Sequence, residues 1–596
     1  MKSAFISIIL LSIILLLSCK NEGHSHTHSL LLETESFPNK GGWVVDPQFV
    51  EQMGSPYLIA HGLGNPVKDA KTELNISKAG RYFVWVRTMN WAPGDWKAPG
   101  RFKIKVNDTI LEKELGTTSG WHWQLAGKAK LKKGTNNIVL KDLTGFDGRC
   151  DAIFFSRDNV SPPNDKEQLK LWRQQQSGKS NIPDKVENYD LVITGGGIAG
   201  CAAAIAASEE GLSVALIHDR PVLGGNASSE IRVHTLGITW KYDRILKKLN
   251  TKHWPNGSPE AKESDNKRMK NVKSYRNIDL FLNFRAFNAN TSGNTITSVD
   301  ARHTSTGETI RFKAPLFVDC TGDGWIGYWA GAEYMYGREE KTKYNEGLKE
   351  YGNLWSPDKA DNRVMGSSVI WRSTNAKRPV TFPDVPWAMP VAKNHSAING
   401  EWYWEYSTDS LSQIDDAEKI RDHMLKAIYG SFYNAKQKKK NQNIKLEWVS
   451  YLLGKRESRR LKGDYIYTFN DVKSMKKFKD AVAKGIREVD VHYQQNLVDL
   501  RIPDFLSEAM YYKVKGYYIP YRTLYSKNIS NLFMAGRCFS CSHIGLGGPR
   551  VMNTTGQMGA AVGYAASLCI KHNTTPRGIY QKHLNELLNL IDERSK

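Results

Sequence analysis

The chain has 596 residues, enough for at least two domains. Its 83 basic residues outnumber its 61 acidic ones, and the net charge of +22 indicates anionic partners: nucleic acid, an anionic membrane or an acidic glycan. With seven cysteines the sequence implies no disulfide framework, and it lacks the clustered Cys-x-x-Cys runs that hold an iron–sulfur cluster.

The N-terminus carries the features of an export signal. Lys2 precedes an apolar run over residues 5–17, which is too short to span a bilayer comfortably. The run ends in Leu16-Leu17-Ser18-Cys19, which resembles a bacterial lipobox. We therefore expect residues 1–18 to be a lipoprotein signal peptide and Cys19 to be the lipid anchor. The alternative is an ordinary signal peptide followed by a chance cysteine.

A polar tether is expected over residues 19–29. Alternating histidines at positions 24, 26 and 28 can bind a metal, but a solvated linker is the favoured interpretation, and the sequence predicts no metal site. Lys20, rather than an aspartate, follows the anchor, which by resemblance to lipoprotein sorting favours the outer membrane. An exported protein held at a membrane is not expected to meet nucleic acid.

Residues 30–158 are expected to form a small β-sandwich. Alternating apolar residues in runs such as 82–86 and 102–106 indicate half-buried strands, with Gly, Asn and Asp turns between them. The layout resembles galactose-binding-like carbohydrate modules, and aromatic side chains stack on sugars, so glycan binding is one interpretation. A tryptophan-rich core with a docking face for the next domain is the other. The tryptophans concerned are Trp43, Trp85, Trp91, Trp96, Trp121 and Trp123.

Residues 159–186 are predicted to be a linker around one short helix, because Pro162-Pro163 and a Gln- and Ser-rich stretch flank it. The most informative motif follows directly. A short apolar strand at 191–193 leads into Gly195-x-Gly197-x-x-Gly200 and then an Ala-rich helix, which is the context that the dinucleotide fingerprint requires.

Each residue of this turn has a physical role. Gly195 allows the tight turn, Gly197 lets the backbone approach a pyrophosphate, and Gly200 lets the helix pack close to the strand. Ile198 and Ala199 begin the helix, whose free N–H groups and positive dipole end attract phosphates.

The acid that should bind the adenosine ribose is displaced by one residue or absent. The second strand, 213–217, is followed by His218 and only then by Asp219, although a neutral histidine can still hydrogen-bond a hydroxyl. The next loop carries Gly224-Gly225-Asn226. A glycine pair here resembles flavoproteins with two dinucleotide motifs, in which this loop runs along FAD.

Two later segments agree with a flavoprotein. A β-rich stretch ends in Asp319-Cys320-Thr321-Gly322-Asp323, which resembles the strand-then-turn element of FAD enzymes. An apolar strand then closes on Gly536-Arg537 and leads to a helix from about residue 550 that carries Gly556 and Gln557. In FAD proteins this element closes the flavin site, where the helix dipole stabilises negative charge on the reduced ring.

Together with Gly454-x-Arg456-Glu457-Ser458-Arg459-Arg460 and Ile519-Pro520-Tyr521-Arg522, these motifs resemble the FAD-dependent oxidoreductase family over residues 186–575. That family includes exported bacterial proteins labelled "xanthan lyase-like", although no residue supports the lyase label. The resemblance implies an α/β fold, with a Rossmann-type, two-dinucleotide-motif FAD domain over residues 187–596. It also implies an inserted α+β substrate region at roughly 335–515, and FAD as the cofactor.

The sequence offers two candidates for the base that takes a hydroxyl proton as hydride leaves carbon. His543 follows Arg537 by six residues and precedes the flavin-closing helix, although it could simply hold its loop by a backbone hydrogen bond. His234 lies on the loop expected to face the ring.

Arg456 and Arg459 are candidates to clamp an anionic substrate, as is Arg232, with solvated surface pairs as the alternative. Cys538-x-x-Cys541 suggests disulfide chemistry, but a structural disulfide or two inert thiols are favoured.

The sequence therefore predicts an FAD-dependent oxidoreductase that oxidises a carbohydrate hydroxyl during polysaccharide breakdown or uptake at the cell surface. It names neither the substrate nor the electron acceptor. A non-catalytic surface glycan-binding protein and a flavin-assisted elimination or isomerisation remain open as alternatives.

Overall fold

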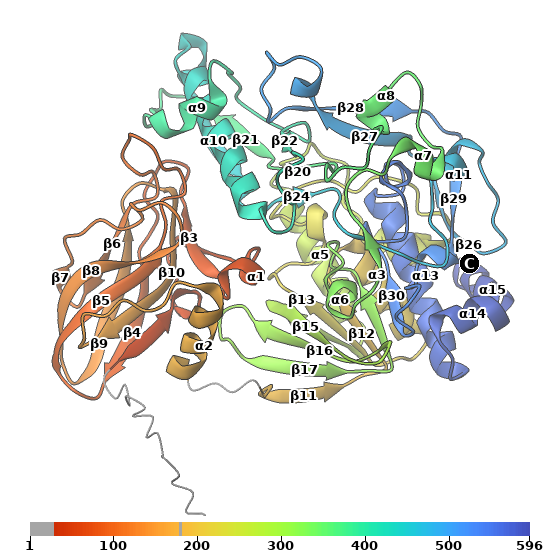
Figure 1. Cartoon of the computed structure of the whole chain (residues 1–596), viewed down its shortest axis with the longest axis horizontal. Helices are drawn as coiled ribbons and strands as arrows, with labels where there is room; N and C mark the ends of the chain where they lie inside the picture. The colour runs from red at the N-terminus through yellow and green to blue at the C-terminus, as the bar shows by residue number, and fades with distance from the viewer. Residues whose placement is uncertain (1–28, 178–181) are drawn as a thin grey trace, which may run out of the picture.

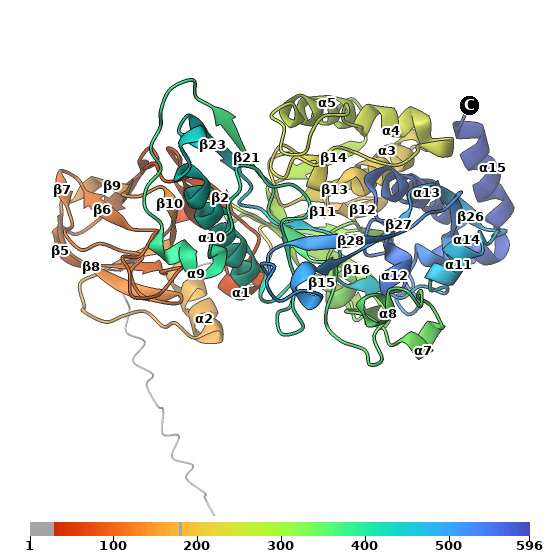
Figure 2. The same ribbon diagram turned by 90° about the horizontal axis from the view of Figure 1, so that it is seen from above.

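The computed structural model describes residues 29–177 and 182–596, so the predicted signal peptide, Cys19 and the tether up to residue 28 lie outside the described residues. An antiparallel β-sandwich and a larger α/β domain lie side by side (Figures 1 and 2). Within the two described ranges, no helix is both long enough and apolar enough to cross a bilayer.

Two antiparallel sheets form the sandwich. One has the order β2–β3–β10–β5–β8, with β1 also beside β10, and the other has the order β4–β9–β6–β7. Their apolar faces meet in one core, as the alternation of buried Tyr82, Val84 and Val86 along β5 requires. The strands are β1 (Leu30–Glu33), β2 (Val44–Asp46), β3 (Tyr57–His61), β4 (Ala70–Ile76), β5 (Gly80–Thr88), β6 (Phe102–Val106), β7 (Thr109–Ile110), β8 (His122–Leu131), β9 (Gly134–Asp142) and β10 (Phe146–Ser156).

The predicted linker contains a helix that packs back onto the sandwich. Helix α2 (Lys166–Ser177) places Trp172 against Trp123, with ring centroids 5.6 Å apart, and pairs Arg173 with buried Asp151. After the gap at residues 178–181, β11 (Lys185–Asn188) joins a sheet of the larger domain.

The larger domain is built on a five-stranded parallel sheet of order β14–β13–β12–β18–β30. Its strands are apolar on both faces because both are covered: Leu191 and Ile193 face one core, and Val192 faces another. These strands are β12 (Leu191–Thr194), β13 (Val214–His218), β14 (Ile278–Leu282), β18 (Leu316–Asp319) and β30 (Leu532–Met534).

Helices α3 (Ile198–Glu209) and α13 (Met552–Lys571) cover one face of this sheet. They pack very closely: a Cβ at Gly559 would lie 2.0 Å from the Ala199 carbonyl oxygen, and one at Gly563 would lie 2.4 Å from that of Ala203. A second sheet covers the other face. It has the order β11–β17–β16–β15 and contains β15 (Phe284–Ser292), β16 (Thr295–His303) and β17 (Thr309–Lys313).

Between β18 and β30 the chain forms several small sheets and helix α10 (Ala417–Lys436), which lies against the sandwich (Figure 1). A single apolar core joins the two parts, with Tyr57 and Trp91 from one side and Trp387 and Tyr429 from the other. Further elements of this region are β20 (Ser367–Ser368), β22 (Glu405–Tyr406), β24 (Gly454–Lys455), β26 (Ala481–Gly485), β27 (Val489–Gln494), β28 (Ser507–Tyr512) and β29 (Tyr517–Pro520). The short helix α12 (His543–Leu546) follows β30.

The six tryptophans of the sandwich are all buried or half-buried. Trp43 lies in the sandwich core, and Trp85 and Trp123 belong to the cluster with α2. The remaining three, Trp91, Trp96 and Trp121, pack in or against the core shared with α10. The sandwich therefore uses these side chains for packing and docking.

Candidate active site

Most of the residues predicted to hold the cofactor meet at one cavity of about 260 Å³. It lies at the carboxyl ends of β12, β13 and β18, where open α/β sheets bind their ligands. The predicted cofactor residues in its wall are Gly195, Gly197, Ile198, Ala199, His218, Asp219, Gly224, Gly225, Asn226, Gly322, Asp323, Gly536 and Arg537.

The glycine turn fits a pyrophosphate. Gly195 has φ +109°, and a Cβ there would lie 2.2 Å from the Cys320 carbonyl oxygen; a Cβ at Gly200 would lie 1.9 Å from that of Gly195. At Gly197, by contrast, a Cβ would meet nothing within 4 Å, so its surface is open. Gly197 also caps α3 without a side chain, which leaves the first-turn N–H groups for phosphate oxygens.

His218 lies in the cavity wall but serves the turn. Its Nδ1 accepts a hydrogen bond from the Gly196 N–H at 3.1 Å, and its Nε2 bonds the Val222 carbonyl oxygen at 3.0 Å. Burial lowers the pKa of this imidazole to about 4, so the ring is neutral at neutral pH. With both nitrogens engaged, the ring has no group left for a ribose hydroxyl, which leaves Asp219 as the acid at this strand end.

A buried acid and two cations lie at the next turn. Asp323 pairs with the Lys455 Nζ at 2.6 Å and with the Arg537 guanidinium at 3.2 Å. Burial alone would raise the pKa of Asp323, but these cations hold it well below its usual range. Gly322 makes room for this cluster, since a Cβ there would lie 2.5 Å from the Arg537 Cζ.

Helix α13 begins at the cavity, where Met552 and Thr555 line the wall. Gly556 and Gln557 lie deeper, in the packing of the helix. A Cβ at Gly556 would lie 2.5 Å from Leu246, and the Gln557 side chain accepts from the Lys484 N–H and donates to the Ile238 carbonyl oxygen. The positive end of the helix dipole therefore faces the cavity, while Gly556 and Gln557 do not line it.

The profile of the FAD dependent oxidoreductase family matches residues 190–588, which contain the glycine turn and every other motif of this cavity. The chain belongs to this family. FAD is therefore its cofactor, and the predicted α/β fold with a Rossmann-type FAD domain behind a β-sandwich is confirmed.

Solved structures resemble parts of the oxidoreductase at low identity. A geranylgeranyl bacteriochlorophyll reductase-like protein of Thermoplasma acidophilum is 12% identical, with 69% of this chain and 84% of that chain covered and a TM-score of 0.30. A GH26–CBM35 β-(1,4)-mannanase of Podospora anserina is 16% identical, with 32% of this chain and 50% of that chain covered and a TM-score of 0.18. CBM35 of Paenibacillus barcinonensis is 17% identical, with 22% of this chain and 98% of that chain covered and a TM-score of 0.18. No curated protein matches the sequence.

Two arginines, Arg456 and Arg550, line the cavity of the oxidoreductase. Arg456 donates to the Ser368 hydroxyl at 2.5 Å and to the Trp402 carbonyl oxygen at 2.7 Å. Arg550 lies 3.3 Å from a carboxylate oxygen of Asp490. Both are largely buried, with side chains 10% and 14% exposed, so their positions are fixed by these contacts.

A carboxylate–histidine–carboxylate chain connects the two arginines. His492 lies 2.6 Å from Glu405, which pairs with Arg456, and 2.9 Å from Asp490, which pairs with Arg550. Burial alone would raise the pKa of Glu405, but Arg456 and His492 hold it below its usual value. These groups come from β22, β27 and the segments after β24 and before α13, and no sequence motif joins them. Only Arg456 is among the residues that the sequence predicts for the site.

Arg459 and Arg232 do not line the cavity. The Arg459 guanidinium lies over Tyr328 at 4.0 Å and over Trp325 at 4.5 Å, and it donates to the Asp323 carbonyl oxygen. Arg232 lies over Trp448 at 4.1 Å and donates to the Gly257 carbonyl oxygen at 3.1 Å. In these positions both arginines hold neighbouring loops in place by stacking on aromatic rings and by hydrogen bonds to backbone carbonyl oxygens.

His543 lies outside the cavity wall, 2% exposed, at the first residue of α12. Its Nδ1 lies 2.8 Å from a carboxylate oxygen of Glu457, and its Nε2 is buried without a hydrogen-bond partner among the described residues. Glu457 is fixed in turn by the Met365 N–H and by Arg460. A carboxylate that accepts from Nδ1–H leaves the lone pair of a neutral imidazole on Nε2.

His234 also lies outside the cavity wall. Its ring is half-buried against His253, with centroids 4.4 Å apart, and beside Trp254. Burial lowers its pKa.

The CxxC thiols are buried as well: Cys538 donates to the Asp319 carbonyl oxygen, and Cys541 to that of Phe539. Burial raises both thiol pKa values, and all six cysteines in the described ranges are free.

Proposed function

We propose that this oxidoreductase oxidises a hydroxyl group of a carbohydrate during polysaccharide degradation or uptake at the cell surface. The pairing of His543 with Glu457 is the observation that supports it most directly. Glu457 orients the imidazole, and Nε2 is the nitrogen left to take the hydroxyl proton. FAD, when bound, supplies the hydride acceptor, so the substrate carbon loses a hydride as its hydroxyl loses a proton.

The lining of the cavity suits a hydroxylated substrate, whether neutral or anionic. Arg456 and Arg550 line it, and guanidinium groups bind hydroxyl oxygens and, in bidentate fashion, carboxylates. The net charge of +22 also favours encounter with acidic glycans.

The deciding experiment uses the purified holoprotein under anaerobic conditions. Neutral and acidic oligosaccharides are added in turn, and the flavin absorbance near 450 nm is followed. Bleaching by a sugar supports the proposal. Sugar binding without bleaching would favour a glycan-binding protein, and a changed sugar with a still-oxidised flavin would favour elimination or isomerisation. Reoxidation of the bleached protein by candidate acceptors then identifies the class of electron acceptor.

We propose further that the protein is exported and anchored to the outer membrane through Cys19. The support is the apolar run at residues 5–17 with the Leu16-Leu17-Ser18-Cys19 sequence. Cys19→Ala should move the protein from the membrane to soluble fractions. Lys20→Asp is the matched variant. It keeps the anchor, so the protein should stay membrane-bound, but it should no longer be found in the outer membrane. Unchanged partition of Cys19→Ala would contradict the anchor.

A further inference from the structure

One loop of the sandwich forms part of the wall of the FAD cavity. Residues Pro47, Gln48, Phe49, Glu51 and Gln52 line the same space as the glycine turn and the end of β13. The loop follows β2 and includes the short helix α1 (Val50–Met53), which points from the sandwich towards the parallel sheet (Figure 1). The cavity is therefore built by both parts of the chain.

Glu51 reaches the position where the adenosine end of FAD is expected. It binds the Arg285 guanidinium at 2.5 Å, and Arg285 lies 3.0 Å from Asp219, the residue after the buried end of β13. Burial alone would lower the pKa of Arg285, but Glu51 and Asp219 raise it above its usual value and keep the group charged. Glu51, Arg285 and Asp219 all line the cavity.

The role of Glu51 follows from what His218 cannot do. In dinucleotide-binding folds an acid at the end of the second strand accepts hydrogen bonds from ribose hydroxyls. Here the residue at that position is His218, and both of its ring nitrogens are engaged by backbone groups. The acids left at this stretch of the wall are Asp219 and Glu51, joined through Arg285.

We infer that the N-terminal sandwich is a working part of the FAD site, and that Glu51, together with Asp219, binds the ribose hydroxyls of the adenosine moiety. The sandwich thus contributes a cofactor-binding residue from outside the family domain, which begins at residue 190.

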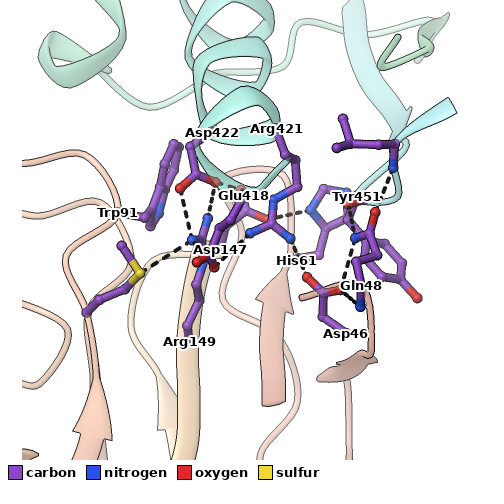
Figure 3. A network of polar contacts seen from close by, with 12 residues as sticks. Asp46, Gln48, His61, Trp91, Asp147, Arg149, Glu418, Arg421, Asp422 and Tyr451 are labelled. Atoms are coloured by element: carbon purple, nitrogen blue, oxygen red, sulfur yellow. Dashed lines mark hydrogen bonds and ion pairs between the residues drawn. The ribbon is translucent and has the colours of Figure 1, made fainter. Parts of the chain in front are cut away.

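Buried contacts between the two parts fix this loop in place (Figure 3). Asp46, just before the loop, forms an ion pair with Arg421 of α10, and both side chains are fully buried. The Gln48 side chain accepts from the Leu453 N–H at 2.8 Å and donates to the Tyr451 carbonyl oxygen at 3.1 Å. Two residues after Leu453, Lys455 enters the cavity wall and binds Asp323.

The same interface carries a second buried cation. Arg149 of β10 binds Glu418 at 2.8 Å and also pairs with Asp422, both on α10. Because buried ion pairs tolerate little displacement, the sandwich docks in one geometry and holds Glu51 at a fixed place. Docking and FAD binding then stabilise one another, since a ligand that contacts both parts favours the docked state.

The test measures FAD binding by the full-length holoprotein in equilibrium dialysis. Glu51→Gln should raise the FAD dissociation constant about tenfold, which corresponds to about 1.4 kcal/mol, and Glu51→Ala should raise it at least as much. Glu114→Gln is the matched control: it removes an ion pair with Arg101, at 2.6 Å, on the sandwich away from the cavity, and should leave the dissociation constant unchanged. Unchanged FAD affinity in both Glu51 variants would overturn the inference.

Hydrogen exchange separates a direct contact from a general loss of stability. FAD should slow amide exchange in residues 47–53 of the wild-type chain, while exchange in β7 (Thr109–Ile110), outside the cavity wall, should not change. Equal exchange of residues 47–53 with and without FAD would also overturn the inference. Because this measurement needs no substitution, it holds even where a Glu51 variant folds poorly.

Discussion

His218 accepts a hydrogen bond at Nδ1 from the backbone N–H of Gly196, and through Nε2 it binds the carbonyl oxygen of Val222. One neutral imidazole thereby ties the glycine turn to the loop that leads to Gly224. A protonated ring would place a hydrogen on Nδ1, directly against the Gly196 N–H. The shape of the phosphate-binding turn therefore depends on the charge of this side chain.

This relationship predicts that stability falls in mild acid. Burial lowers the folded-state pKa of His218 to about 4, against 6.5 for the free side chain, so the unfolded chain takes up the proton first. The contribution is complete above about pH 6.5 and is lost as the pH falls towards 4, up to roughly 3 kcal/mol. Urea unfolding at stepped pH measures it. His218→Asn should be less stable at neutral pH and should show a shallower slope; an equal slope would contradict the assignment.

The glycine turn predicts opposite outcomes for two neighbouring substitutions. A Cβ at Gly197 meets no atom within 4 Å, so the FAD-free Gly197→Ala protein should melt at an unchanged temperature. It should bind FAD at least about tenfold more weakly, because the methyl group occupies phosphate space. A Cβ at Gly200 would lie 1.9 Å from a backbone oxygen, so Gly200→Ala should lower the melting temperature itself. An unchanged FAD dissociation constant in Gly197→Ala would contradict the pyrophosphate site.

Local motifs account for what the sequence could predict. Gly195, Gly197 and Gly200 follow one another along a strand, a turn and a helix, so their spacing carries their geometry, and the family and cofactor follow from it. Gly556 and Gln557 show the limit of the same reasoning. The sequence places the helix correctly along the chain, but only three-dimensional packing shows that Gly556 lies against Leu246 and that the Gln557 side chain binds the β26 backbone.

Residues from separate elements could not be predicted in this way. Glu405, His492 and Asp490 meet Arg550 through pairings of short strands that leave no periodic signal in the sequence. Glu51 belongs to a different part of the chain from Arg285, and only the docked structure brings their charges together. The charge excess gave no indication of these pairs, because buried cations and surface cations count alike in a composition.

The docking interface predicts a local loss of stability at Tyr57. Its hydroxyl donates to Glu418 at 2.6 Å and accepts from Arg421 at 3.0 Å, and the side chain is fully buried. Tyr57→Phe should lower the free energy of unfolding by about 1–3 kcal/mol, because the buried Arg421 and the half-buried Glu418 each lose a partner. Tyr82→Phe is the control: it loses one bond, to the Lys78 carbonyl oxygen, within the sandwich. Urea titrations compare the two, and an equal loss in both would contradict the larger contribution of the interface hydrogen bonds.

The base is tested at His543. His543→Ala should retain FAD yet slow anaerobic flavin reduction by substrate by about 10²–10⁴-fold, the usual contribution of a positioned general base. Glu457→Gln should give a smaller loss, since the imidazole stays in place but loses the carboxylate that orients it. Because the ring is 2% exposed, the substrate must displace part of the α12 segment to reach Nε2, so hydrogen exchange in residues 540–550 should rise when substrate binds. Unchanged reduction in His543→Ala would remove it from the mechanism, and the same assay on His234→Ala would then decide whether the second histidine takes the proton.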